Sequence, residues 1–268
     1  MHRTGSGETF LPLAFIMVDR NDFAYRRLQP SIVLTDASIP HVIWGQDAVE
    51  YNFGAFYVYD EELDLQILLS PSMIQEAVEL LAPSYYPMTL DEIDAEVKAA
   101  SKNDARFAFT RAFRDRPDDF TRLKLLQRDA EAGPSHVLLI ANTVFDYPLD
   151  EIVQRPFPHC PELPFPTVPA VIRLIPVHLQ KWTGVGFSPQ SFPFILACEM
   201  LLGGAIGFSF AKELEEAYAS SDQLPTRLKD MIHSLDERQK VWVYEYFHIG
   251  QGSESSSDSD GDILPHLL

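Results

Sequence analysis

The amino-acid sequence predicts an α+β fold, with a small mixed sheet in its first half and helices toward its C-terminus. Two observations predict the sheet. The segment His41–Ser70 reads as strand, glycine turn, short helix and strand, and His136–Ala141 is a further apolar strand-like run. A third observation predicts the helices, because apolar residues recur every three to four positions from Val168 onward.

The predicted turn at Gly45 separates two segments of different character. His41–Trp44 is a short apolar run after Pro40 and predicts a strand. Gln46–Phe53 predicts a short helix, which Gly54 is placed to end. Because the first backbone amides of a helix have no partner within it, they could face a phosphate group at this turn.

The second strand of this unit carries polar residues on one face. Leu63–Leu69 alternates between apolar and polar residues at its start, so Asp64 and Gln66 share one face while Leu65 and Ile67 share the other. Two carboxylates at this spacing would hold a divalent metal ion. In this chain the second of the two positions is an amide.

Together these segments resemble the core of the nucleotidyltransferase fold, in particular the branch that contains bacterial toxin–antitoxin nucleotidyltransferases and uncharacterised fungal nucleotidyltransferase-like proteins. The resemblance rests on Trp44-Gly45-Gln46 at the turn, on Asp64-Leu65-Gln66 in the next strand, and on a helix expected over Pro71–Leu81. The strand at His136–Ala141 and the approach to a helix over Leu163–Trp182 fit the same pattern. The resemblance implies a nucleotidyltransferase-like core with a C-terminal helical region.

The resemblance also implies roles for four residues. Asp64 is the candidate catalytic residue and metal ligand, with Mg²⁺ as the cofactor it would hold. Gly45, Gln46 and Gln66 are candidate substrate-binding residues. A two-metal transferase needs two or three converging carboxylates, and the neutral amide of Gln66 contributes no negative charge. We therefore expect a degenerate metal site in a protein that serves as a binding or regulatory module.

Two alternatives stay open at this point. The chain could be an active Mg²⁺-dependent nucleotidyltransferase that acts on a small molecule or a protein and uses Asp64 with an unorthodox second ligand. It could also be an interaction protein with an unrelated α/β fold. The sequence leaves open whether the chain is an enzyme. The expected ligand is a nucleotide or another small molecule, and no protein partner can be named.

The charge of the chain limits its partners. It has 39 acidic and 21 basic residues, which gives a formal net charge of −18. Proteins that bind nucleic acid usually present a basic surface to the phosphates, so this balance argues against a DNA or RNA partner. It argues equally against an anionic membrane surface.

Two further features bear on the cellular compartment. Phe192–Phe210 has the length of a membrane span, but Glu199 and several glycines interrupt it, so we expect a buried helix over Phe194–Leu202 and no membrane span. The chain has two cysteines, Cys160 and Cys198, and a secreted protein of this size would usually carry more. We expect an intracellular protein, cytoplasmic or nuclear.

Changes in composition divide the chain into four parts. Residues 1–150 form the expected nucleotidyltransferase-like α/β core. Residues 151–169 are rich in proline and predict an ordered or semi-extended connector rather than a helix. Residues 170–249 have helical periodicity, and residues 250–268 form an acidic, serine-rich tail that is expected to be disordered.

One helix in the first part has a clear start signal. Leu90–Ala100 has apolar residues at helical spacing, and Thr89 with Glu92 three residues later forms the capping-box pattern. We expect the acidic side chains of this helix to face water.

Overall fold

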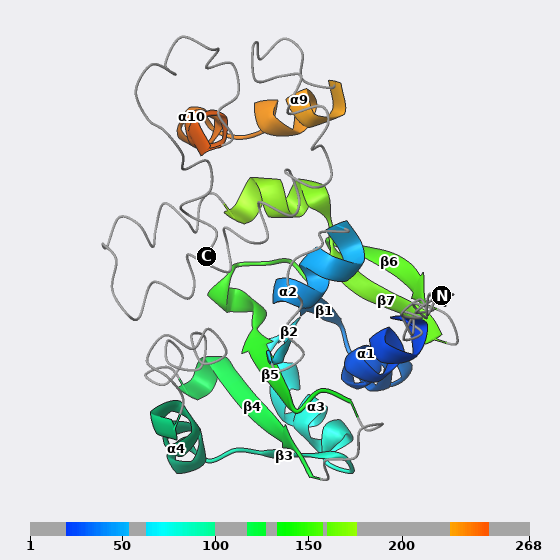
Figure 1. Ribbon diagram of the computed structural model, residues 1–268. Helices are drawn as coiled ribbons and strands as arrows, with labels where there is room; N and C mark the ends of the chain where they lie inside the picture. The colour runs from blue at the N-terminus through cyan, green and yellow to red at the C-terminus, as the bar shows by residue number, and fades with distance from the viewer. Residues whose placement is uncertain are drawn as a thin grey trace, which may run out of the picture.

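The structure is a computed structural model that describes residues 20–53, 63–99, 117–126, 133–157, 160–175 and 226–246. Its centre is a five-stranded mixed sheet with the strand order β1-β2-β5-β4-β3 (Figure 1). The strands are β1 (His41–Trp44), β2 (Leu65–Leu69), β3 (Tyr85–Pro87), β4 (Phe120–Leu125) and β5 (His136–Ala141). The predicted α+β class with a mixed sheet is therefore confirmed.

Helices precede and follow these strands along the chain. They are α1 (Arg20–Asp36), α2 (Gly45–Ala48), a π-helical turn (Val49–Phe53), a 3₁₀ turn (Pro71–Met73), α3 (Ile74–Leu81), α4 (Leu90–Ala99), α9 (Thr226–His233) and α10 (Glu237–Tyr246). Residues 168–175 are also helical. The helices expected after Gly45, over Pro71–Leu81 and after Thr89 are all present.

β2 and β5 form the buried middle of the sheet. β2 pairs antiparallel with β1 and parallel with β5, and β5 pairs antiparallel with β4. The apolar residues Val137–Ala141 of β5 are fully buried, as are Leu65 and Ile67 of β2. A continuous apolar strand is typical of a sheet that is covered on both faces.

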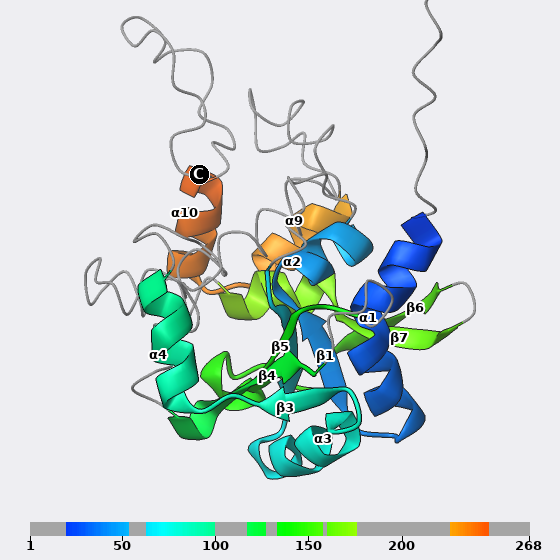
Figure 2. The same cartoon turned by 60° about the horizontal axis from the view of Figure 1, so that its bottom comes forward.

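The two faces of the sheet are covered by different helices (Figure 2). On the α1 face, His41 of β1 lies within hydrogen-bond distance of Ser31 on α1. On the α4 face, Arg122 of β4 donates a hydrogen bond to Glu96 on α4. Register places Arg122 level with Leu138 and Gln66, so Gln66 also points to the α4 face. This agrees with the predicted alternation, in which Leu65 and Ile67 point the other way.

The proline-rich segment is ordered and not helical, but it is a β-hairpin packed on the core rather than a connector. β6 (Ile152–Phe157) pairs antiparallel with β7 (Cys160–Pro166), and β7 contacts both β1 and α1. Leu163 and Phe165 of β7 are completely buried and belong to the main hydrophobic core. Prolines are tolerated in a two-stranded sheet because alternate backbone amides point away from the partner strand. The buried apolar residues between the prolines therefore decide the structure.

The described C-terminal helices lie where the periodicity predicts them. Leu228, Ile232 and Val243 of α9 and α10 are buried in the core cluster. Within the described ranges, no helix has both the length and the apolar character required to cross a membrane. Gly54, the segment Phe192–Phe210 and the tail 250–268 lie outside those ranges.

Candidate functional site

Gly45 forms the tight turn that the sequence predicts. Its φ is +63°, in the left-handed region that disfavours residues with a side chain. A Cβ atom at this position would lie 2.6 Å from Oε1 of Gln66, which is too close for two non-bonded atoms. The turn therefore requires glycine for its backbone conformation, and the end of the Gln66 side chain occupies the space beside it.

Asp64 is held by an arginine from two strands away. The guanidinium group of Arg122 donates from Nε to Oδ2 of Asp64 at 2.8 Å and from Nη2 to Oδ1 at 3.0 Å. Both residues are buried, with 2% of Arg122 and 5% of Asp64 exposed. Burial alone would lower the pKa of Arg122, but the Asp64 carboxylate outweighs it and raises that pKa above its usual value. Two parallel hydrogen bonds to a carboxylate form a strong and directional ion pair.

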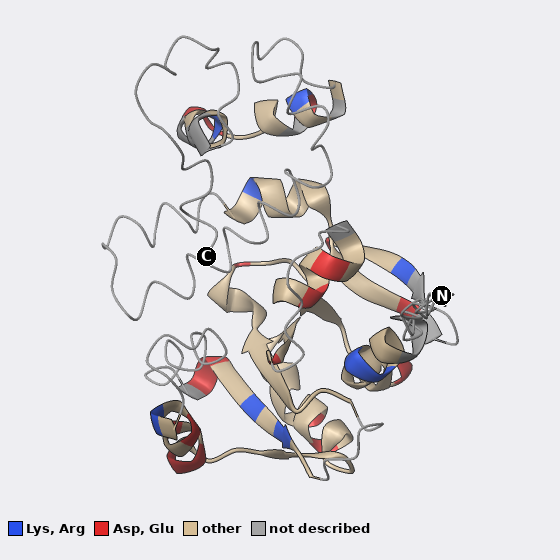
Figure 3. Ribbon diagram, in the orientation of Figure 1, with Lys and Arg blue, Asp and Glu red and all other residues tan. Residues whose placement is uncertain are grey.

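Glu96 of α4 binds the same arginine and a neighbouring lysine. Arg122 Nη1 donates to Oε2 of Glu96 at 2.7 Å, and Lys124 Nζ donates to Oε1 at 2.7 Å. Burial opposes ionisation of Glu96, but the hydrogen bonds from Lys124 and Arg122 prevail and lower its pKa. The expectation that the acidic residues of this helix face water is wrong for Glu96, because it accepts hydrogen bonds from two cations on β4. Figure 3 shows these basic positions on β4 in blue and the acidic positions on α4 in red.

His136, at the start of β5, lies between these two carboxylates. Its Nδ1 is 4.0 Å from Oδ1 of Asp64, and its Nε2 is 3.5 Å from Oε2 of Glu96. Neither distance is a hydrogen bond, and Nε2 is a buried atom without a hydrogen-bond partner. Burial, together with the nearby charge of Arg122, lowers the pKa of His136, so the ring is neutral at pH 7.

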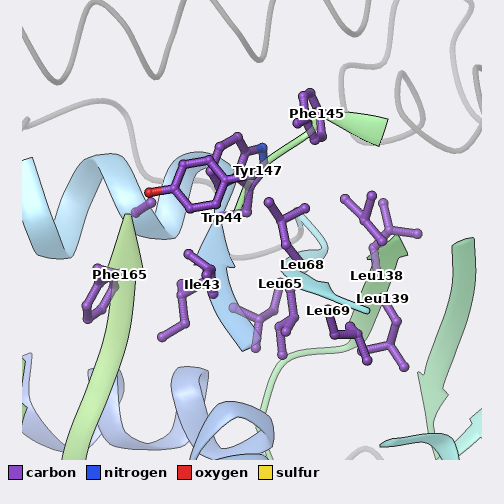
Figure 4. Close-up of a cluster of buried hydrophobic side chains, with 14 of the residues drawn as sticks. Ile43, Trp44, Leu65, Leu68, Leu69, Leu138, Leu139, Phe145, Tyr147 and Phe165 are labelled. Carbon is purple, nitrogen blue, oxygen red and sulfur yellow. The ribbon is translucent and has the colours of Figure 1, made fainter. Parts of the chain in front are cut away.

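Two other buried polar atoms lie on the α4 face near the turn. Nε1 of Trp44 and Oε1 of Gln66 have no hydrogen-bond partner, and the two residues are level with each other on β1 and β2. The Trp44 ring packs against Phe145 and Tyr147, with ring centroids 5.2 and 5.0 Å away (Figure 4). Aromatic packing thus fixes Trp44 beside the glycine turn.

Of the predicted site residues, the structure brings Gly45 and Gln66 into contact, and half-buried Gln46 follows Gly45 at the start of α2. Asp64 pairs instead with Arg122, which was not a predicted site residue. Among the described residues, no group of three or more histidine, cysteine, aspartate or glutamate side chains is arranged to hold a metal ion. The role of Asp64 as a metal ligand stays a prediction, and in the structure both of its carboxylate oxygens accept hydrogen bonds from an internal cation.

The sequence analysis did not identify Arg122 as part of the site. The signal that could have found it is the strand Phe120–Leu125, in which Arg122 and Lys124 alternate with Leu123 and Leu125. An arginine in the middle of a buried strand must be paired with an acid.

A second buried ion pair fixes the position of the turn. Arg27 of α1 donates from Nε and Nη2 to the two carboxylate oxygens of Asp47 at 2.9 and 2.8 Å, and from Nη1 to the backbone oxygen of Leu63 at 2.8 Å. One side chain therefore joins α1, the helix after Gly45 and the backbone just before Asp64.

A buried serine and histidine form a pair that resembles a hydrolase dyad only in its distance. Ser31 Oγ lies 2.7 Å from Nε2 of His41, while Nδ1 of His41 donates to the backbone oxygen of Ile39. Burial lowers the pKa of His41 to about 4. Since Ser31 and His41 are buried in the core, no substrate reaches them, and the pair is structural.

The comparisons with known proteins add no family to this geometry. No protein-family model matches the chain, and no curated protein sequence matches it.

Proposed function

We propose that this chain is a nucleotidyltransferase-like protein that binds a nucleotide or another small phosphate-bearing molecule and does not catalyse metal-dependent transfer. The observation that carries the proposal is the guanidinium group of Arg122 on both carboxylate oxygens of Asp64. The order of β1, glycine turn, α2, β2 and α3 supports the nucleotidyltransferase-like part of the proposal.

The ion pair argues against a catalytic metal at Asp64. A divalent cation would have to displace Arg122, and that would leave a buried guanidinium group without its principal carboxylate partner. Breaking a buried pair in this way costs about 3–5 kcal/mol. Gln66, at the second position of the motif, cannot offset this loss, because its neutral amide adds no negative charge to attract a metal ion.

The space beside Gly45 is already filled by another side chain of the protein. Gln66 makes the close approach that the absent side chain of Gly45 permits. A nucleotide at this turn would compete with the Gln66 amide for the same space. This supports ligand binding on the face of the sheet over phosphate binding at the turn, as a working transferase would need.

The test is an assay of the full chain with labelled nucleoside triphosphates and Mg²⁺ or Mn²⁺. We expect nucleotide binding without turnover, and we expect Gln66→Asp to increase metal-dependent activity because it restores the second carboxylate. Glu79→Gln, at an exposed position of α3, is the matched control for Asp64→Asn, since each change removes one negative charge. Turnover by the wild-type chain that Asp64→Asn abolishes, with the fold retained by circular dichroism, would establish the active enzyme instead.

A further inference from the structure

Three basic side chains on the α4 face converge on one carboxylate. Arg122 and Lys124 of β4 each donate a hydrogen bond of 2.7 Å to Glu96, and Nε2 of His136 on the adjacent β5 lies 3.5 Å from the same group. The carboxylate comes from α4, an element outside the sheet, and 23% of its side chain is exposed. Glu96 therefore reaches this cluster from the solvent side.

The carboxylate does not satisfy all three basic groups. Its two oxygens accept from Arg122 and Lys124, and Nε2 of His136 is left buried without a hydrogen bond. Buried polar groups without partners are rare, and each one points to a missing partner. A phosphoryl group has three terminal oxygens, so it could accept one hydrogen bond from each of the three side chains.

We propose that Arg122, Lys124 and His136 form a binding site for a phosphoryl group, and that Glu96 occupies this site in place of the ligand. The ligand displaces Glu96, accepts from Arg122 Nη1 and Lys124 Nζ, and accepts the third hydrogen bond from His136 with its proton on Nε2. This inference deepens the proposed function, and rests on it for the phosphate-bearing class of ligand.

The local charge balance favours this exchange. Asp64 neutralises one of the two permanent cations, so the removal of Glu96 leaves the cluster with one uncompensated positive charge. Lys124 has 40% of its side chain exposed and can follow an incoming anion. The net charge of −18 on the whole chain disfavours a long polyanion, so the expected ligand is a small molecule that carries phosphate.

The experiment measures the binding of inorganic tripolyphosphate, ATP and adenosine to the full chain by calorimetry, without divalent metal and at constant ionic strength. Glu96→Gln removes the competing charge and keeps the size of the side chain. We expect this variant to bind tripolyphosphate roughly tenfold more tightly than the wild type, which corresponds to the loss of one charged hydrogen-bonding competitor. Glu79→Gln on α3 makes the same change in net charge outside the cluster, and we expect no change in affinity. Adding Lys124→Met to Glu96→Gln should reverse the gain.

The wild-type chain provides a second readout that needs no variant. The ring nitrogen signals of His136 should shift in a saturable way as tripolyphosphate is added, because the anion gives Nε2 a partner. The proposal is overturned if Glu96→Gln and Glu79→Gln have equal effects, or if the wild-type His136 signals do not respond. Saturation by ATP but not by tripolyphosphate would also overturn it, because the nucleoside rather than the phosphoryl group would then be recognised. Metal-dependent turnover would refute the proposed function alone, since these titrations contain no metal.

Discussion

Arg122 on β4 reaches across β5 to hold both carboxylate oxygens of Asp64, the residue just before β2. The pairing compensates the buried charge of Asp64 with a cation of the protein itself. Under the proposed function, this is the residue that would face a divalent cation in a metal-dependent transferase.

The first prediction concerns the stability of this ion pair. Arg122→Met should lower the free energy of unfolding by about 3–5 kcal/mol, because Asp64 is then buried without its partner. The double variant Arg122→Met/Asp64→Leu should recover much of the loss, since no charge stays buried alone. Urea unfolding of the variants and the wild type measures both effects. Equal losses in the single and double variants would show that the charge pairing is not the cause.

The second prediction concerns the turn. Gly45→Val should cost about 1–3 kcal/mol, because the new side chain meets Gln66 and the backbone has a φ of +63°. Gln46→Ala at the next position is the control and should stay within about 0.5 kcal/mol of the wild type. Denaturant midpoints compare the two. Equal tolerance at both positions would show that neither the positive φ of Gly45 nor its contact with Gln66 constrains the turn.

The local parts of this unit could be predicted from the sequence. The strand His41–Trp44, the glycine turn and the helix after Thr89 depend on short-range signals such as apolar runs, glycine and a capping box. The capping box forms as expected, with Thr89 N donating to Glu92 at 2.8 Å and Glu92 N donating to Thr89 Oγ1 at 3.3 Å. These signals act over a few residues, so they can be recognised in a single sequence.

The third prediction concerns pH. Burial lowers the pKa of His41 to about 4, against 6.5 in an unfolded chain. Between these values the unfolded state binds the proton and the folded state does not, so His41 reduces stability as the pH falls through this window. The loss should reach about 3 kcal/mol at the acidic end. His41→Gln should remove this loss of stability at low pH. The difference in free energy of unfolding between the wild type and the variant should therefore narrow toward acidic pH. A gap that stays constant would show that His41 does not titrate this way.

The fourth prediction tests the place of the β6–β7 hairpin in the core. Phe165→Ala should lower the free energy of unfolding by about 3–5 kcal/mol, because the side chain is completely buried. Gln154→Ala on the partner strand is exposed and should change stability by less than about 0.5 kcal/mol. Thermal or urea unfolding separates the two. A small effect of Phe165→Ala would indicate that the hairpin behaves as the connector that its prolines suggest.

The hairpin and the ion pairs could not be predicted because they depend on contacts between distant residues. Asp64 and Arg122 are 58 residues apart, and Glu96 reaches Arg122 from a separate helix. The spacing of residues along one segment does not reveal which strand becomes its neighbour. The prolines of the hairpin gave a strong local signal for a connector, but the burial of Leu163 and Phe165 outweighed it.

The most direct test of the account is a titration of the wild-type chain with Mn²⁺, observed by NMR, in the absence of nucleotide. Mn²⁺ broadens the signals of nearby nuclei, so it reports where a divalent metal binds without any change to the protein. Because Arg122 holds Asp64, we predict that the signals of Gly45, Asp64 and His136 broaden no more than those of exposed acidic residues such as Glu79. Selective, saturable broadening at Asp64 and Gly45 would contradict the account and show that a metal displaces Arg122 from its carboxylate.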